Sequence, residues 1–282
     1  MARIPLKIFP LLDLLYGEIV SDIDLVVKIG GSTLGSHDTT IRDLIELQKQ
    51  GYKIVVVHGG GNVISDWMSK QNLSPLFIDG LRVTDRPSLD IVVAVLTGLI
   101  NKEMVSLVNR LGGKSVGISG VDGQILEGFI PNPDLGYVGQ VTNVNDEPLR
   151  VILESGYMPM VSPVGVHVND GSENSGIPLN INGDTSAGEI AKKLCPERLV
   201  FLTDVPGIMD NNGRVIPRMN LSIASNLINS GVIKGGMIPK LGACITALNN
   251  VKYADIIDGR TPNSLMSCVN DERIGTRILG SK

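Results

Sequence analysis

A short apolar run that encloses one lysine and ends in two glycines restricts the fold of this chain most. Residues 25–32 read LVVKIGGS, and apolar runs closed by glycine are typical of strands buried in a parallel sheet. Glycine has no Cβ, so a bound group can approach the backbone N–H groups there, and the N-terminus of a following helix attracts an anion. Lys28 could reach such an anion, or it could extend to solvent from an ordinary turn. The run alone leaves both interpretations open.

The same succession of strand, glycine turn and helix is repeated directly downstream. A strand at residues 25–29 is expected to lead to a helix at 39–50 and to a second strand at 53–57. The turn His58-Gly59-Gly60-Gly61 then opens a helix that runs to about residue 71. This alternation predicts the α/β class with a largely parallel, doubly wound sheet. Both glycine turns would lie at the carboxyl edge of the sheet, where such folds bind ligands.

The rest of the chain divides into two halves. In the first half we expect a long helix at 87–110, a strand at 115–118, a hairpin formed by 124–130 and 137–143, a helix at 148–155 and a strand at 158–161. The segment 163–178 is rich in Gly, Asn, Ser and Pro and predicts a boundary between two lobes. The second half is expected to hold helices at 184–193, 222–229 and up to 250, with strands at 199–202 and 254–257.

Composition excludes several classes of protein. With 25 Lys and Arg against 29 Asp and Glu, the net charge of −4 argues against a general nucleic-acid or membrane surface. Pro10, Asp13 and Glu18 interrupt the apolar residues near the amino terminus, so residues 1–23 predict a packing or assembly segment instead of a signal peptide or a membrane span. The three cysteines lie far apart in the sequence, which predicts reduced thiols, a cytoplasmic protein and no metal site.

Two familiar nucleotide motifs are absent. The segment Gly112-Gly113-Lys114-Ser115 ends like a phosphate-binding P-loop, but Val108 stands where the first glycine of that motif belongs. No Gly-x-Gly-x-x-Gly follows either leading strand, and His58 stands where a dinucleotide site has an acidic residue. A nicotinamide enzyme is therefore not expected, and His58 is interpreted as a packed, hydrogen-bonded side chain.

The remaining features describe a site for two anions. Lys28, Arg82 and Lys240 are isolated cations beside turns, and Asp184 lies in the first turn of a helix after two asparagines. Each also has an ordinary explanation. Asp184 could interact favourably with the dipole at the N-terminus of its helix, and Lys240 could be a solvated helix residue. Together with the glycine turns they supply N–H groups, cations and one carboxylate that could hold the cations.

Six segments, taken in order from residue 24 to the end, resemble the motifs of the acetylglutamate kinases. They are Val27–Ser32 (VKIGGS), Val57–Gly61 (VHGGG), Gly80–Asp85 (GLRVTD), Asn180–Asp184 (NINGD), Leu202–Ile208 (LTDVPGI) and Gly235–Lys240 (GGMIPK). The resemblance implies the amino-acid-kinase fold, an open αβα sandwich around a largely parallel sheet of eight strands. It implies transfer of the ATP γ-phosphoryl group to the side-chain carboxylate of N-acetyl-L-glutamate, with Mg²⁺ carried by the nucleotide and no metal site in the protein.

The resemblance also assigns roles to residues. An amino-acid-binding lobe would span residues 24–178 and an ATP-binding lobe residues 179–282. Lys28 and Lys240 would be the transition-state cations, oriented by Asp184. The acidic substrate would be bound by Gly60, Gly61, Arg82 and Asn180, and the nucleotide by Gly30, Gly31, Asp204, Val205, Pro206, Gly207, Ile208, Met209, Ile233, Lys234 and Gly235.

Some features leave alternatives open. Arginine-inhibited members of the family have a histidine and a glutamate where Asn263 and Cys268 fall, which favours an enzyme without arginine feedback. An amino-terminal extension is typical of the inhibited hexamers, but Pro10 disfavours a continuous helix there, so a homodimer is expected and a hexamer is the alternative. A sibling kinase acting on an aminoadipate derivative or on aspartate, and a catalytically silent nucleotide-binding regulator, are the competing functions.

Overall fold

The described residues form a central sheet of eight strands in which all neighbouring pairs but one are parallel. The computed structural model describes residues 22–30, 39–210, 212–233 and 235–280. β1 (Leu25–Ile29) lies inside the sheet, between β2 (Ile54–His58) and β11 (Arg198–Thr203). The strand order is β12-β14-β13-β11-β1-β2-β8-β5, and only β13 and β14 pair antiparallel. The other strands are β5 (Ser115–Ser119), β8 (Met158–Ser162), β12 (Arg218–Asn220), β13 (Tyr253–Asp258) and β14 (Thr276–Leu279).

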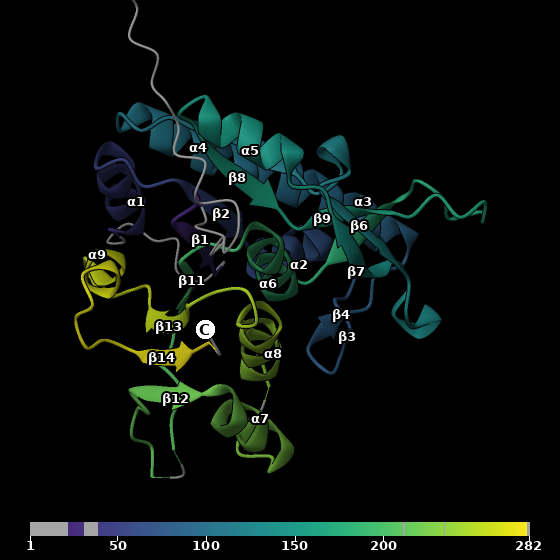
Figure 1. The fold of residues 1–282 in the computed structure, drawn as a ribbon. Coiled ribbons are helices and arrows are strands. Elements are labelled where there is room, and N and C mark those ends of the chain that lie inside the picture. The colour runs from purple at the N-terminus through teal and green to yellow at the C-terminus, as the bar shows by residue number, and fades with distance from the viewer. Residues whose placement is uncertain (1–21, 31–38, 211, 234, 281–282) are drawn as a thin grey trace, which may run out of the picture.

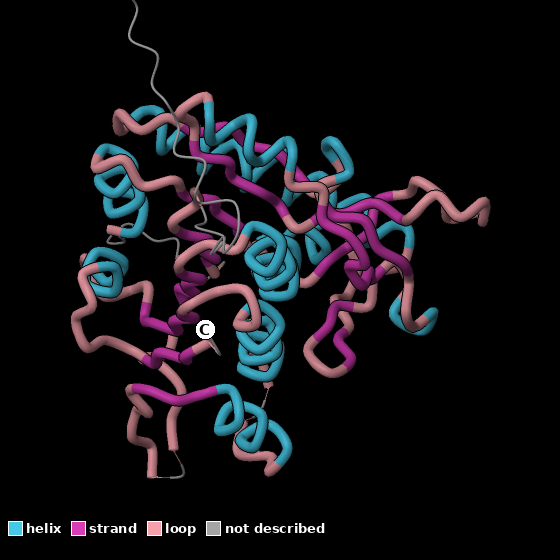
Figure 2. Tube along the Cα trace, viewed as in Figure 1, coloured by secondary structure: helices cyan, strands magenta, loops and turns pink. Residues whose placement is uncertain are grey.

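Helices cover both faces of this sheet, as Figures 1 and 2 show. One face packs against α5 (Glu147–Glu154), α6 (Gly183–Leu194), α7 (Leu221–Asn229) and α8 (Met237–Ala247). The other packs against α1 (Thr40–Lys49), α2 (Gly61–Lys70), a long helix from Arg86 to Arg110, and α9 (Ser264–Val269). The expected open αβα sandwich with eight strands is therefore confirmed.

The alternation of side chains along β1 decides where its lysine points. Successive residues of a strand face opposite sides of the sheet. Val26 belongs to the apolar core under α6 and α8, whereas Leu25, Val27 and Ile29 belong to the core under α1 and α2. Lys28 has the parity of Val26, so its side chain leaves the sheet on the α6 side.

A small closed barrel and a hairpin project from the sheet beside α6. The barrel consists of β6 (Leu126–Phe129), β7 (Val138–Val144), β9 (Val164–His167) and β10 (Pro178–Ile181). The antiparallel pairing of β6 with β7 confirms the predicted hairpin at 124–143. The second hairpin joins β3 (Phe77–Ile78) to β4 (Leu81–Arg82), and Figure 1 shows it below the barrel.

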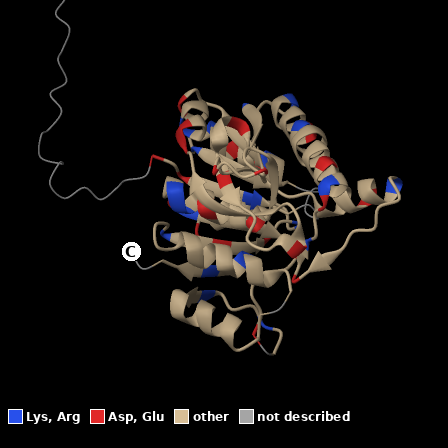
Figure 3. Ribbon diagram, turned by 90° about the vertical axis from the view of Figure 1, so that its right-hand side faces the viewer, with Lys and Arg blue, Asp and Glu red and all other residues tan. Residues whose placement is uncertain are grey.

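The long predicted helix at 87–110 is interrupted by a π-helical segment. It consists of α3 (Arg86–Val93), a π-helix η1 (Ala94–Ile100) and α4 (Asn101–Arg110). It has 25 residues, and a stretch of 18 of them has a mean hydropathy of 1.8, so it could cross a membrane by length and composition alone. The apolar core on this face of the sheet includes Val92, Leu96 and Met104 of the helix. The helix is therefore apolar because one side of it packs against the sheet. Figure 3 shows acidic and basic positions interspersed over the ribbon.

The structure adds elements that the sequence did not predict. Strand β9 lies in the segment 163–178, which we had interpreted only as a lobe boundary, and β10 begins at the last residue of that segment. In the carboxyl-terminal part β12, α9 and β14 were not predicted. Residues 1–21 of the expected amino-terminal segment lie outside the described residues.

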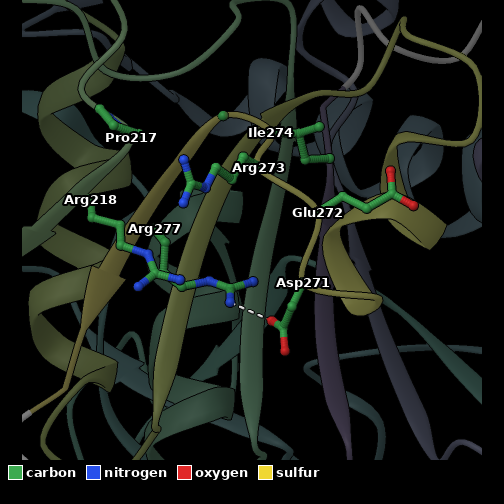
Figure 4. A pocket seen from close by; sticks show the side chains of 8 residues that line it. Pro217, Arg218, Asp271, Glu272, Arg273, Ile274 and Arg277 are labelled. Carbon is green, nitrogen blue, oxygen red and sulfur yellow. Dashed lines mark hydrogen bonds and ion pairs between the residues drawn. The ribbon is translucent and has the colours of Figure 1, made fainter.

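A buried ion-pair network holds the unpredicted strand β14 against β13. Arg277 Nε donates to Asp255 Oδ1 at 2.7 Å, and Asp255 is 1% exposed. Arg198 Nη2 donates to Asp271 Oδ1 at 3.1 Å, and Arg277 pairs with the same carboxylate, as the dashed line in Figure 4 marks. This network borders a cavity of about 230 Å³ over the edge of the sheet. Because removal of one partner leaves a buried charge unpaired, the network fixes the position of β14.

The contact between α6 and α8 generates a prediction about stability. A Cβ at Gly188 in α6 would come within 2.9 Å of both Cβ and O of Ala243 in α8. Gly188→Ala should therefore push the helices apart and lower the free energy of unfolding by about 1–3 kcal/mol. The reason is that the cost of overpacking exceeds the stabilisation expected when alanine replaces glycine in a helix. Urea unfolding measures the change.

Gly242→Ala is the matched control. Gly242 is the neighbour of Ala243 in α8, and a Cβ there would meet no atom within 4 Å. This variant should be unchanged or stabilised by up to about 1 kcal/mol. Equal stability of the two variants would contradict close packing at Gly188.

Candidate functional site

The carboxylate of Asp184 lies between two lysine side chains from distant parts of the chain. Lys28 Nζ is 2.7 Å from Asp184 Oδ1, and Lys240 Nζ is 3.1 Å from Asp184 Oδ2. Lys28 is 7% and Asp184 5% exposed. The three residues that the sequence singled out as catalytic candidates are therefore brought together, with one anionic and two cationic groups at one point.

The local sequence explains why Asp184 is held there. Asn182 is the N-cap of α6, and its Oδ1 accepts hydrogen bonds from the backbone N–H groups of Asp184 at 2.9 Å and Thr185 at 3.1 Å. An N-cap of this kind fixes the first helical turn, and the positive end of the helix dipole favours a carboxylate in it. Because β1 directs Lys28 toward the α6 side, the lysine and the aspartate meet at the carboxyl edge of the sheet.

The charge state of Asp184 follows from its neighbours. Burial alone would raise the pKa of this carboxyl, but the ammonium groups of Lys28 and Lys240 outweigh the desolvation and hold its pKa below the usual range. Asp184 is therefore ionised at neutral pH. The cluster keeps one net positive charge, which suits a site that receives anions.

A cavity of about 210 Å³ opens beside this cluster. Its lining includes all four residues predicted to bind the acidic substrate, together with Lys28 and Asp184. Those four are Gly60, Gly61, Arg82 and Asn180. The cavity thus joins the predicted acid-binding residues to two of the three predicted catalytic residues.

Arg82 and Asn180 are held in place by neighbouring groups. Arg82 Nη2 donates to Gly61 O at 2.8 Å and to Ser65 Oγ at 2.9 Å, and its guanidinium lies 4.7 Å from the centroid of the Phe77 ring. Asn180 Nδ2 donates to Thr84 Oγ1 at 2.9 Å. These contacts leave other guanidinium N–H groups and the amide oxygen of Asn180 for a ligand.

The glycine turn after β2 presents backbone donors. Gly60 is the N-cap of α2 and Gly61 its first residue, so neither N–H group has a partner within the helix. Within residues 39–210, where this turn lies, neither N–H group donates to a carbonyl or side-chain oxygen. Free N–H groups at a helix N-terminus are suited to a carboxylate or a phosphate.

The predicted nucleotide residues lie on loops around the carboxyl ends of β1 and β11. Gly30 N donates to Leu202 O at 3.1 Å, which ties the glycine turn to β11. The loop from Asp204 to Met209 follows β11, and it is fixed where Ile208 N donates to Thr276 Oγ1 at 2.8 Å. Asp204, Pro206 and Met209 are exposed, Val205 is partly buried, and Gly207 is buried.

The second group of predicted nucleotide residues precedes α8. Ile233 is buried, and Gly235 is exposed with a left-handed φ of 56°. Gly31 and Lys234, which belong to the same prediction, lie outside the described residues. None of the nucleotide residues that the structure describes lines the 210 Å³ cavity.

No group of three or more His, Cys, Asp or Glu side chains among the described residues could hold a metal ion. Both carboxylate oxygens of Asp184 face lysines.

The sequence did not reveal the apolar wall of the cavity. Phe77, Leu81, Leu96, Val138 and Pro163 line it together with the polar residues. Phe77 and Leu81 belong to the short β3–β4 hairpin, Leu96 to the π-helix and Val138 to the barrel. Among the apolar lining residues, only Leu81 and Ile181 stand inside motifs that the sequence offered, because the wall is assembled from elements far apart in the chain.

Known proteins resemble this chain over nearly its whole length. Residues 25–258 match the amino acid kinase family. A protein of Dehalococcoides mccartyi named acetylglutamate kinase is 43% identical over 261 residues, which are 93% of this chain and 96% of that protein. A Nostoc protein of the same name is 44% identical over 267 residues, or 92% of this chain and 88% of that protein.

Solved structures give the same result for the fold. The structure of smu.665 from Streptococcus mutans superposes with a TM-score of 0.78 at 26% identity, over 91% of this chain and 98% of that one. The chain therefore belongs to the amino acid kinase family and, within it, to the acetylglutamate kinases.

Proposed function

We propose that this protein transfers the γ-phosphoryl group of ATP to the side-chain carboxylate of N-acetyl-L-glutamate, giving N-acetylglutamyl 5-phosphate in arginine biosynthesis. The observation that carries the proposal is the placement of Lys28 and Lys240 on the two oxygens of Asp184, beside a cavity lined by Arg82 and Asn180. This arrangement presents two cations, held in a fixed geometry, at the edge of a cavity for an acid.

The reaction needs no general base. A glutamate-type carboxyl has a pKa of about 4.3 and is already a nucleophile at neutral pH. The obstacle is the repulsion between this carboxylate and the phosphates of the nucleotide. Positioned cations and N–H groups remove that repulsion, as expected for phosphoryl transfer.

The two lysines supply the charge. An ammonium about 4 Å from a phosphoryl oxygen contributes about 4 kcal/mol at an effective dielectric constant near 20. Asp184 acts as the orienting group, because it is ionised and accepts from both lysines instead of facing the acid as a base. Mg²⁺ would arrive bound to the β- and γ-phosphates as part of the nucleotide substrate and would neutralise charge there.

We assign the acid to residues 24–178 and ATP to residues 179–282, with residues 1–23 as an assembly segment. Arg82 and the N–H groups of Gly60 and Gly61, joined by Asn180 from the second half, would bind the carboxylates of the acid. The nucleotide would lie against the Asp204–Met209 loop, the glycine turn after β1 and the segment before α8. The support is that the acid residues share one cavity and the nucleotide loops meet the same edge of the sheet.

We further propose that the protein works in the cytoplasm as a homodimer, with a hexamer as the alternative. The described cysteines Cys195, Cys244 and Cys268 are free thiols, which fits a reducing compartment. Insensitivity to arginine stays a prediction. Cys268 is 1% exposed and burial raises its pKa to about 12, so this thiol stays neutral and cannot replace a carboxylate that pairs with an arginine ligand.

The substrate is tested by measuring ADP release and hydroxamate formation with three acids. N-Acetyl-L-glutamate should give turnover at least about tenfold above N-acetyl-aminoadipate and aspartate, because one methylene in a closed pocket is worth about 1–3 kcal/mol. A preference for either of the other acids would assign a sibling kinase. ATP binding without ADP release for any acid would identify a silent regulator.

Lys240→Ala should lower kcat by about 10²–10³-fold with little change in KM for ATP, as for the loss of one preorganised charge. Steady-state kinetics at saturating acid measures this. Lys49→Ala, at the exposed end of α1, is the control and should keep wild-type kinetics. If Lys240→Ala retained most of its turnover, Lys240 would have no part in the transition state.

Arg82→Ala should mainly raise KM for the acid, by about 10-fold or more, because this residue holds the ground state and the transition state alike. The control is Arg86→Ala, since Arg86 pairs only with exposed Asp90 on the surface of α3. Kinetics with each substrate varied in turn separates the two KM values. A rise in KM for ATP alone would reverse the assignment of the two halves.

A further inference from the structure

His58 is a buried polar residue directly before the glycine turn of the site. It ends β2, is 0% exposed and lies on the sheet face opposite Lys28. It is not among the residues that line the cavity. It nevertheless makes two hydrogen bonds with ring nitrogens that point to different partners.

These partners fix the tautomer of the ring. Nδ1 lies 3.0 Å from Gly59 O, and a carbonyl oxygen can only accept, so Nδ1 carries the proton. Nε2 lies 3.1 Å from Asn101 Nδ2. Because a neutral imidazole has one donor and one acceptor, Nε2 accepts from this amide.

The amide of Asn101 is oriented by its other contacts. Asn101 is 0% exposed, and its Nδ2 also donates to Met160 O at 2.9 Å. Its Oδ1 accepts from Lys102 Nζ at 3.0 Å. An ionised aspartate or a leucine at this position would leave His58 Nε2 without its donor and would remove the bond to Met160 O, so the network requires the asparagine.

The π-helix places the side-chain amide of Asn101 in the protein interior. The segment Ala94–Ile100 ends directly before Asn101, and a π-turn shifts the register of the residues that follow it. The same segment also packs on the glycine turn, since a Cβ at Gly60 would overlap Ile100 and Leu96. The glycine turn is thus held by a hydrogen bond from the His58 ring and by packing against the π-helix.

The hydrogen bond to Gly59 O has a consequence for the next N–H group. A peptide unit is planar and trans, so its C=O and N–H point in opposite directions. The bond from His58 therefore also fixes the direction of the Gly60 N–H, which lies in a turn that lines the cavity.

We propose that His58 and Asn101 form a buried positioning pair that aims the Gly60 N–H at the carboxylate of the acidic substrate. The proposal rests on the proposed function for the identity of that substrate. Lys28 of β1 and Lys102 of α4 are the charged groups that act on His58, and both disfavour an imidazolium. Burial, together with these two cations, lowers the pKa of His58 to about 4, so the pair keeps its hydrogen bonds at neutral pH.

Two variants that differ in their ability to donate a hydrogen bond test the proposal. In His58→Asn the side-chain amide can still donate from the Nδ position to Gly59 O, whereas His58→Leu cannot, and both lose the bond to Asn101. His58→Leu should lower kcat/KM for N-acetyl-L-glutamate by about 10- to 100-fold with unchanged KM for ATP, because a misdirected donor loses transition-state contact. His58→Asn should recover to within about threefold of the wild type. Equal losses in both variants would reduce His58 to a packing role and overturn the proposal.

The tautomer is tested without any assay of activity. The chain has three histidines, and long-range ¹H–¹⁵N spectra of the wild type and of His58→Asn identify the signals of His58. The expected result is a neutral ring protonated at Nδ1 that does not titrate between pH 5 and 8. A ring protonated at Nε2, or a titration near pH 6.5, would overturn the pair. This result stands even if the wild type fails to release ADP with the acid, so the two proposals fail separately.

Discussion

The carboxylate of Asp184 is the interaction on which the rest of the site depends. Two ammonium groups lie 2.7 and 3.1 Å from its oxygens, and without it they would face each other in a largely buried place. An unpaired charge in such a place is expensive, because the low dielectric strengthens the repulsion and desolvation removes the water that would screen it. The lysines can converge only because an anion is fixed between them.

That requirement makes α6 the central helix of the fold. Its N-terminus carries Asp184 at the edge of the sheet, and its body packs on β1, β2 and β11. The close approach at Gly188 brings α8, and with it Lys240, to the same edge. Since β1 supplies Lys28 and α8 supplies Lys240, the site forms only when the sheet and both helices have packed. Folding and assembly of this charge cluster are therefore one event.

Much of this could be predicted because its determinants are local. Apolar strands that end in glycine, and an asparagine before a helix, are signals within a few residues, and the resemblance of six ordered motifs supplied Lys28, Asp184 and Lys240. The parts that were missed have no local signal. β14 was hidden because Arg277 interrupts its apolar pattern, and that arginine belongs inside the sheet only because Asp255 is there to pair with it. His58 was correctly interpreted as packed and hydrogen-bonded, but its partner Asn101 was missed, because it lies 43 residues away and is brought there by a π-turn that the hydrophobic periodicity does not predict.

The donor capacity of the two lysines shows how Asp184 can hold them without disabling them. An ammonium has three N–H donors. Among the described residues, Lys28 makes an ion pair only with Asp184, and Lys240 contacts only Asp184 and Gly236 O. Each lysine therefore keeps at least one N–H group that no described residue occupies. Because one carboxylate neutralises only one of two cations, the cluster remains attractive to the phosphoryl group while its geometry is already set. In the proposed reaction, the cations would therefore stabilise a charge that moves from nucleotide to acid without rearranging as it moves.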